Sequence, residues 1–173
     1  MKRLTLLRHA KSSWDDAGLD DYDRPLNPRG RRDAPEMGRR LKAADQVPDM
    51  LISSPAMRAV SSARMAAREM GFPEQRIIED RSLYHASARE LFSVLTSLET
   101  LAAHLMVVGH NPGLTDLASS LSPVRIDNLP TASLFCVDLD IEDWNELAPG
   151  SGRFAYYDFP KNTRGAVLTA SDL

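Results

Sequence analysis

Three short segments of this sequence each place a cationic or imidazole side chain just beyond an apolar run. Arg8 and His9 follow one such run, Arg58 lies shortly after a second, and His110 follows a third. Short apolar runs bounded by turn residues are typical of buried strands. Because ligands of open α/β sheets bind beyond the carboxyl ends of the strands, we expect these four side chains to meet at one edge. Two arginines and two histidines around one point would bind a dianionic group such as a phosphoryl group.

An imidazole in this position can do more than bind an anion. A neutral imidazole, with an ordinary pKa of about 6.5, can attack phosphorus near neutral pH and later release the phosphoryl group to water. Arg8, Arg58 and a protonated His110 would supply the positive charge that the transferred group needs. The four histidines, at positions 9, 85, 104 and 110, include no His-x-x-x-His pair. We therefore expect no metal and no cofactor.

Each segment also has a purely structural interpretation. A single histidine at a strand end is more often a structural hydrogen-bonding group, and Arg58 could be a solvated charge on a helix face. The Gly-His-Asn-Pro-Gly stretch around His110 could be a simple turn. The occurrence of all three at equivalent strand ends favours an anion site.

The elements that must position these side chains alternate along the chain. The apolar patterns predict strands at residues 4–7, 50–52, 77–78 and 105–108, with later strands at 133–139 and 154–159 that are antiparallel or at an edge. Helices are expected at 28–44, 55–70, 88–101 and 113–121. This alternation predicts an α/β fold with a largely parallel sheet.

Length and composition limit the possible functions. The 173 residues are enough for one domain, which we expect over 1–160, with a loose C-terminal tail over 161–173. A net charge of −3 argues against nucleic acid or an anionic membrane surface as partner. The single cysteine, Cys136, excludes an intramolecular disulfide, and no apolar run has the length of a signal peptide or membrane span. The expected location is the cytoplasm.

The motifs around these residues resemble a known family. The Leu7 to Ser12 stretch, which contains Arg8-His9, resembles the Arg-His-Gly signature of the histidine phosphatase (phosphoglycerate-mutase-like) superfamily, with Ala10 in place of glycine. The segments around Arg58 and His110 resemble its second arginine and second histidine motifs. The stretch from Asp23 to Gly30 is similar to the small SixA-type phosphohistidine phosphatase branch. The resemblance covers roughly residues 2–140, in the same order.

The resemblance implies a mechanism and a fold. It implies that His9 is the nucleophile and that Arg8, Arg58 and His110 hold the phosphoryl group. It also implies a three-layer α/β sandwich whose central sheet has helices on both faces. Further phosphate or substrate contacts are expected from the neighbouring or wall-forming residues Lys11, Ser12, His85, Asn111 and Thr131.

One departure from the family pattern concerns the proton donor. Many members carry a glutamate between the second arginine and the second histidine, whereas this chain has His85 near that position. His85 could be a replacement acid, a structural group or a substrate contact; Asp15 and Asp16 are weaker candidates. Without a carboxylic acid that donates a proton, a poor alkoxide leaving group departs slowly, whereas an imidazole leaving group depends less on such a donor. The short chain between Arg58 and His110 also leaves little room for a lid, so we expect an open pocket.

These features favour hydrolysis of phosphohistidine on a protein, such as a phosphorelay or phosphotransfer domain. The first alternative is a phosphatase of a small phosphomonoester, such as a phosphosugar or nucleotide. A mutase is disfavoured because it calls for a closed site. A non-catalytic module that binds phosphorylated ligands is the alternative from another class, and it would typically lack His9.

Overall fold

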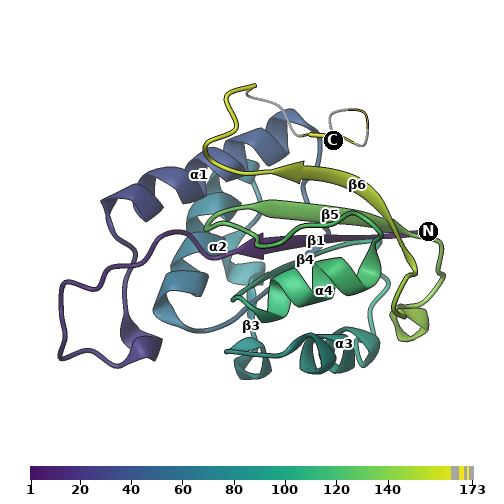
Figure 1. Ribbon diagram of the computed structural model, residues 1–173, viewed down its shortest axis with the longest axis horizontal. Helices are drawn as coiled ribbons and strands as arrows, with labels where there is room; N and C mark the ends of the chain where they lie inside the picture. The colour runs from purple at the N-terminus through teal and green to yellow at the C-terminus, as the bar shows by residue number, and fades with distance from the viewer. Residues whose placement is uncertain (165–167, 170, 172–173) are drawn as a thin grey trace.

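The computed structural model describes residues 1–164, 168–169 and 171, and it contains a six-stranded sheet between two layers of helices (Figure 1). The strand order is β3-β2-β4-β1-β5-β6. The strands are β1 (Lys2–Arg8), β2 (Met50–Ser53), β3 (Ile78–Glu79), β4 (His104–Gly109), β5 (Leu134–Leu139) and β6 (Gly152–Asp158). The first four are parallel, and β5 is antiparallel to both neighbours. The predicted α/β sandwich with a mostly parallel sheet is confirmed.

The helices cover both faces of the sheet. Helices α1 (Pro28–Ala43) and α2 (Met57–Met70) pack on one face through a core that includes Met37 and Ala63. Helices α3 (Ala88–Thr96) and α4 (Gly113–Leu121) cover the other face, where Leu91 and Leu117 belong to a second core. None of the helices in the described part of the chain has both the length and the apolar character needed to cross a bilayer.

Local sequence signals explain where several helices begin and end. Asn27 caps α1 by accepting a hydrogen bond from the Gly30 amide, with Pro28 in the first turn. Gly71 ends α2 in the left-handed conformation that favours glycine. The third helix stops at Thr96, five residues before the predicted end at 101. The Thr96 and Ser97 hydroxyls both bond back to the carbonyl of Ser93, which competes with continuation of the helix.

The chain after β6 was predicted to be a loose tail over 161–173. Among its described residues, Leu168 forms backbone hydrogen bonds with Tyr157 of β6, and the Asn162 amide donates to the buried Asp158. These two contacts attach parts of the segment to the edge strand. Residues 165–167, 170 and 172–173 of the tail lie outside the described residues, and the division at residue 160 stays a prediction.

The register of the parallel strands determines which residues lie side by side where the strands end. Arg8 at the end of β1 pairs with Gly109 of β4, and Ser53 of β2 pairs with Val108 of the same strand. His9, Ser54 and His110 therefore follow their strands at one level of the sheet. The segment between β1 and α1 extends beyond the rest of the molecule at this same end (left in Figure 1).

Candidate active site

A cavity of about 250 Å³ lies at the carboxyl ends of β1, β2 and β4. All nine residues expected from the sequence line it: Arg8, His9, Lys11, Ser12, Arg58, His85, His110, Asn111 and Thr131. Three further side chains complete the lining: Trp14, Asp21 and Arg24. Two segments, residues 11–26 and 129–132, contribute side chains to its walls.

His9 lies directly after β1, is 8% exposed, and has a defined tautomer. Its Nδ1 lies 2.7 Å from the carbonyl oxygen of Ala10. Because a carbonyl can only accept, Nδ1 carries the proton and the lone pair of the neutral ring is on Nε2. Burial, together with the charges of Arg58 and Arg8, lowers the pKa of His9 to about 3, although the hydrogen bond to Ala10 opposes this shift. His9 is therefore a neutral imidazole at pH 7.

Arg8 and Arg58 approach the cavity from two different elements. Arg8 donates from Nη1 to the carbonyl of Leu129 at 2.7 Å, and burial lowers its pKa. Arg58, on the first turn of α2, is only 2% exposed. Both guanidiniums are therefore fixed by the protein before any ligand arrives, which reduces the reorganisation that anion binding requires.

His110 follows β4, and its ring centroid lies 5.2 Å from that of His9. Its Nε2 is hydrogen-bonded to the Ser54 hydroxyl at 2.7 Å. Burial, with smaller contributions from His9 and Arg58, lowers the pKa of His110 to about 2. Burial and the nearby Arg58 therefore favour the neutral imidazole of His110 in the protein alone, and the expectation that a protonated His110 supplies positive charge to a bound phosphoryl group stays a prediction.

Three buried nitrogen atoms of this cluster lack a hydrogen-bond partner within the described part of the chain. They are Nε of Arg8, Nε of Arg58 and Nδ1 of His110. Buried polar groups in proteins are nearly always paired, so each unpaired group needs an explanation. An anion with several acceptor oxygens would supply the missing partners.

Asp21, which the sequence analysis did not select, is the main carboxylate of the site. Its two oxygens accept hydrogen bonds from Arg58, Arg24, Tyr84 and His85, at distances between 2.7 and 3.1 Å. Burial alone would raise the pKa of Asp21, but these donors hold it far below its ordinary value. The sequence has five aspartates between residues 15 and 23, and no local pattern distinguishes the one that turns inward.

His85 lies in the cavity at the position where relatives were expected to carry a glutamate. Its Nε2 donates to Asp21 Oδ2 at 2.9 Å, and its ring centroid is 5.3 Å from that of His110. The backbone of His85 has a φ of 52°, which is uncommon for a residue other than glycine. Asp15 and Asp16, the weaker candidates for a proton donor, are exposed and do not line the cavity.

The other residues expected to contact phosphate differ in how many of their polar atoms already form hydrogen bonds within the protein. The Ser12 hydroxyl accepts a hydrogen bond from Arg24 at 2.6 Å, and Thr131 accepts a long one from Arg29 at 3.5 Å. Asn111 donates to Asn128 and to the Leu129 carbonyl, so its amide serves mainly to hold the neighbouring loop. Lys11 is exposed at the cavity.

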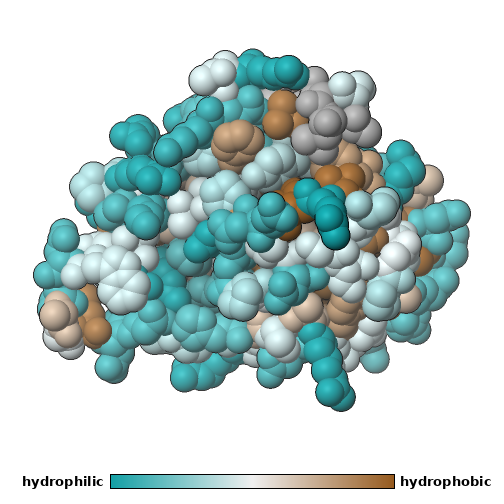
Figure 2. Space-filling model, in the orientation of Figure 1, coloured by the Kyte–Doolittle hydropathy of each residue, from teal (hydrophilic) through white to brown (hydrophobic). Residues whose placement is uncertain are grey.

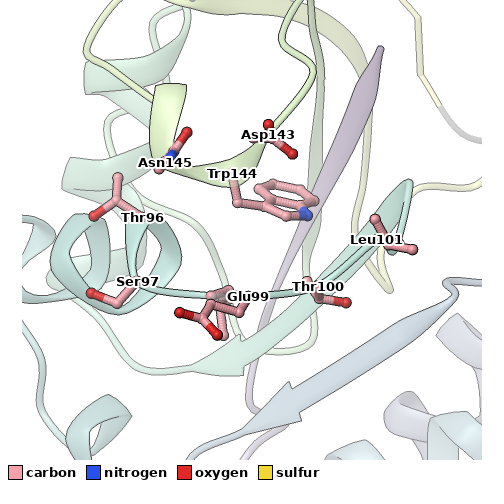
Figure 3. A pocket seen from close by; sticks show the side chains of 9 residues that line it. Thr96, Ser97, Glu99, Thr100, Leu101, Asp143, Trp144 and Asn145 are labelled. Atoms are coloured by element: carbon pink, nitrogen blue, oxygen red, sulfur yellow. The ribbon is translucent and has the colours of Figure 1, made fainter.

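A larger hollow of about 650 Å³ lies at the opposite end of the sheet (Figure 3). It is formed by the end of α3, the following loop and the turn that contains Trp144. Its lining includes the carboxylates Glu99 and Asp143 and no cationic side chain. This hollow has the wrong charge for an anionic ligand, so the smaller cavity is the candidate site.

The site contains the groups needed for phosphoryl transfer through an imidazole. It presents a neutral imidazole with a free Nε2, two fixed guanidiniums and a second imidazole. Within the described residues, no three histidine, cysteine, aspartate or glutamate side chains are grouped so that they could hold a metal ion.

Comparison with known proteins agrees with this geometry. A family model described as histidine phosphatase superfamily (branch 1) matches residues 4–87. An uncharacterised chloroplastic protein of Arabidopsis thaliana is 33% identical over 159 residues, which are 87% of this chain and 72% of the relative.

Solved structures show the same fold. A protein of Agrobacterium tumefaciens assigned as the phosphohistidine phosphatase SixA is 26% identical, with a TM-score of 0.74, over 92% of this chain and 98% of the other. The protein histidine phosphatase SixA complexed with tungstate is 22% identical, with a TM-score of 0.77 and the same coverage.

The bonds of Asp21 predict a specific loss of stability. Asp21→Ala would leave the buried guanidiniums of Arg58 and Arg24 without their carboxylate, so we expect the free energy of unfolding to fall by about 1–3 kcal/mol. Asp23→Ala removes an exposed carboxylate two residues away and should change it by less than about 0.5 kcal/mol. Denaturant unfolding measures both, and equal effects would show that Asp21 does not hold these arginines.

The lowered pKa values of His9 and His110 predict the pH dependence of stability. In the unfolded chain each histidine binds a proton below about pH 6.5, while in the folded protein these two stay neutral until far lower pH. Stability is therefore lost as the pH falls, by up to about 1.4 kcal/mol per pH unit for each histidine. We expect the free energy of unfolding to decrease from pH 7 to 5, and less steeply in His110→Asn. Equal slopes in the two proteins would contradict the burial of a neutral His110.

Proposed function

The chain belongs to the histidine phosphatase superfamily, in its SixA-type branch, and is a phosphatase; from this membership we propose that it hydrolyses phosphohistidine on a protein. We propose further that the reaction proceeds without a metal through a phosphohistidine intermediate on His9. The observation that carries the proposal is the hydrogen bond from His9 Nδ1 to the Ala10 carbonyl, because it leaves the lone pair on Nε2 beside two fixed arginines.

The first step transfers the phosphoryl group to His9. Nε2 forms a bond to phosphorus, and the bond from phosphorus to the leaving nitrogen breaks. The leaving imidazole keeps the electron pair and takes up a proton from solvent, which the water of the second step returns. Arg8 and Arg58 bind the phosphoryl oxygens throughout, and Nδ1 of His110 offers a third contact.

The second step releases inorganic phosphate. Water attacks the phosphorus atom, gives up a proton, and the bond from phosphorus to His9 Nε2 breaks. The neutral imidazole is restored with its proton still on Nδ1, where the Ala10 carbonyl holds it. The hydrogen bond thus keeps the ring in the productive tautomer and orientation in both steps.

The size of the cavity supports a protein substrate. Pockets that enclose small ligands usually measure roughly 300–1,000 Å³, whereas this one measures about 250 Å³. It accommodates a phosphoryl group and the end of the side chain that carries it. The rest of the substrate would lie outside, on the surface around the mouth, as a folded partner does.

One observation favours a second candidate, a phosphatase of small phosphomonoesters. Asp21 holds the His85 ring in the cavity through Nε2, which places an acid–base group near the reacting phosphorus. A donor of this kind would assist the departure of an alkoxide, a service that an imidazole leaving group needs less.

A comparison of substrates in EDTA distinguishes the two candidates. We expect kcat/KM for a phosphohistidine-bearing carrier protein to exceed that for any of a panel of phosphosugars and nucleotides by at least about tenfold. His9→Ala should lower all activities by on the order of 10³-fold or more, because it removes the nucleophile.

Two results would contradict the proposal. A clear preference for one small ester would replace the protein substrate by the second candidate. Activity that survives His9→Ala would exclude the covalent mechanism. His104→Asn serves as the matched control, because His104 is a partly buried histidine on β4 that does not line the cavity.

A further inference from the structure

The mouth of the cavity carries exposed apolar side chains on one side. Trp14 is 71% exposed, Met57 44% and Leu19 40%. Trp14 lines the cavity, and Met57 precedes Arg58 on α2. We use the name mouth loop for residues 13–23, which contain Trp14 and Leu19. In Figure 2, brown atoms at the left end of the molecule mark apolar side chains where this loop projects. Apolar side chains gathered beside a functional pocket are typical of an interaction surface.

The mouth loop is fixed at its base although its tip is exposed. Ser12 and Leu26 pair as a short bridge across the two ends, and the Ser13 amide donates to the Pro25 carbonyl. The Trp14 ring lies 3.5 Å from the Arg24 guanidinium, which itself is bonded to Asp21. Trp14 is therefore held in place before binding, so little conformational entropy is lost when a partner contacts it.

The mouth loop is also strongly acidic. It contains five aspartates and no basic residue. Asp21 turns into the cavity, while Asp15, Asp16, Asp20 and Asp23 are exposed, and none of these four forms an ion pair with another described residue. The mouth therefore combines a cationic cavity floor with an acidic, apolar rim on the loop side.

The cationic cavity floor and the acidic, apolar rim together favour some binding partners over others. A small polyanion would be attracted by the arginines of the cavity but repelled by the exposed carboxylates of the mouth loop, an effect that salt weakens. A second copy of this chain would bring its own acidic loop, and its net charge of −3 would add repulsion. A partner with basic and apolar side chains around its phosphorylated residue satisfies both parts of the mouth.

We propose that the mouth loop is a docking surface for a protein whose phosphorylated residue is flanked by basic and apolar side chains. This inference rests on the proposed function, since it names the kind of partner that presents the phosphohistidine. The loop would contribute to KM and to partner choice, whereas the residues at the cavity floor carry out the transfer.

The test uses histidine peptides phosphorylated with phosphoramidate, in three versions. The phosphohistidine is flanked by lysine and leucine, by glutamate and leucine, or by lysine and serine. At 0.15 M salt we expect kcat/KM for the lysine–leucine peptide to exceed that for the glutamate–leucine peptide by about tenfold, with the lysine–serine peptide in between. The preference should weaken at higher salt.

Two variants of the mouth loop and one control variant test whether the peptide preferences depend on this loop. Replacing Asp15, Asp16 and Asp20 by asparagine should reduce the lysine-over-glutamate preference to about two- to threefold or less, because the rim loses its charge. Leu19→Ser should reduce only the leucine-over-serine preference. The control replaces Glu99 and Glu142 by glutamine and Asp140 by asparagine, which removes the same charge at the other end of the sheet. It should keep both preferences.

Hydrolysis of p-nitrophenyl phosphate, which has no flanking residues, distinguishes a failure of the docking surface from a failure of the proposed phosphohistidine phosphatase activity. If all proteins hydrolyse it and the wild type cleaves the three peptides equally, the docking surface is refuted while the phosphatase remains. If it is hydrolysed and no phosphohistidine peptide is, both the docking surface and the phosphohistidine substrate are refuted.

Discussion

The parallel pairing of β1 and β2 with β4 is the constraint on which the site depends. Each of these strands ends at the same level, because Arg8 pairs with Gly109 and Ser53 pairs with Val108. If β1 shifted by one residue relative to its neighbours, each of its side chains, including Arg8, would move to the other face of the sheet. Such a shift is unfavourable, because it would move Arg3 or Arg8, which flank the buried residues 4–7 of the strand, into the apolar core.

The carboxylate of Asp21 balances the charge that this convergence creates. The three arginine side chains near this point, Arg8, Arg24 and Arg58, would repel one another without a negative partner. Asp21 bonds two of these arginines, Arg24 and Arg58, and it also orients His85. Both Nη atoms of Arg58 donate to Asp21, and its buried Nε has no hydrogen-bond partner among the described residues. In this way the single carboxylate of Asp21 holds side chains from three different segments in place around the cavity.

Local patterns in the sequence were enough to predict the α/β fold with a largely parallel sheet, whereas the helices on both faces were implied by the resemblance to the family. Apolar runs predicted the strands, and the residues directly after them were necessarily at one edge of a parallel sheet. The role of Asp21 could not be predicted, because only the path of the loop decides which of five neighbouring aspartates turns inward. The neutral state of His110 depends on its burial beside Arg58, a tertiary property with no local signal. The early end of α3 at Thr96 reflects hydroxyl groups that compete for backbone carbonyls, against an apolar period that continues to Leu98.

The most direct test of the account is to trap the phosphorylated enzyme. A peptide with ³²P-labelled phosphohistidine is mixed with the protein, the reaction is quenched within milliseconds in base, and the label is mapped by mass spectrometry. The account predicts a base-stable, acid-labile phosphoryl group on His9 that forms and decays at least as fast as turnover and is absent in His9→Asn. Turnover with no label on the protein, or with label on another residue, would contradict it.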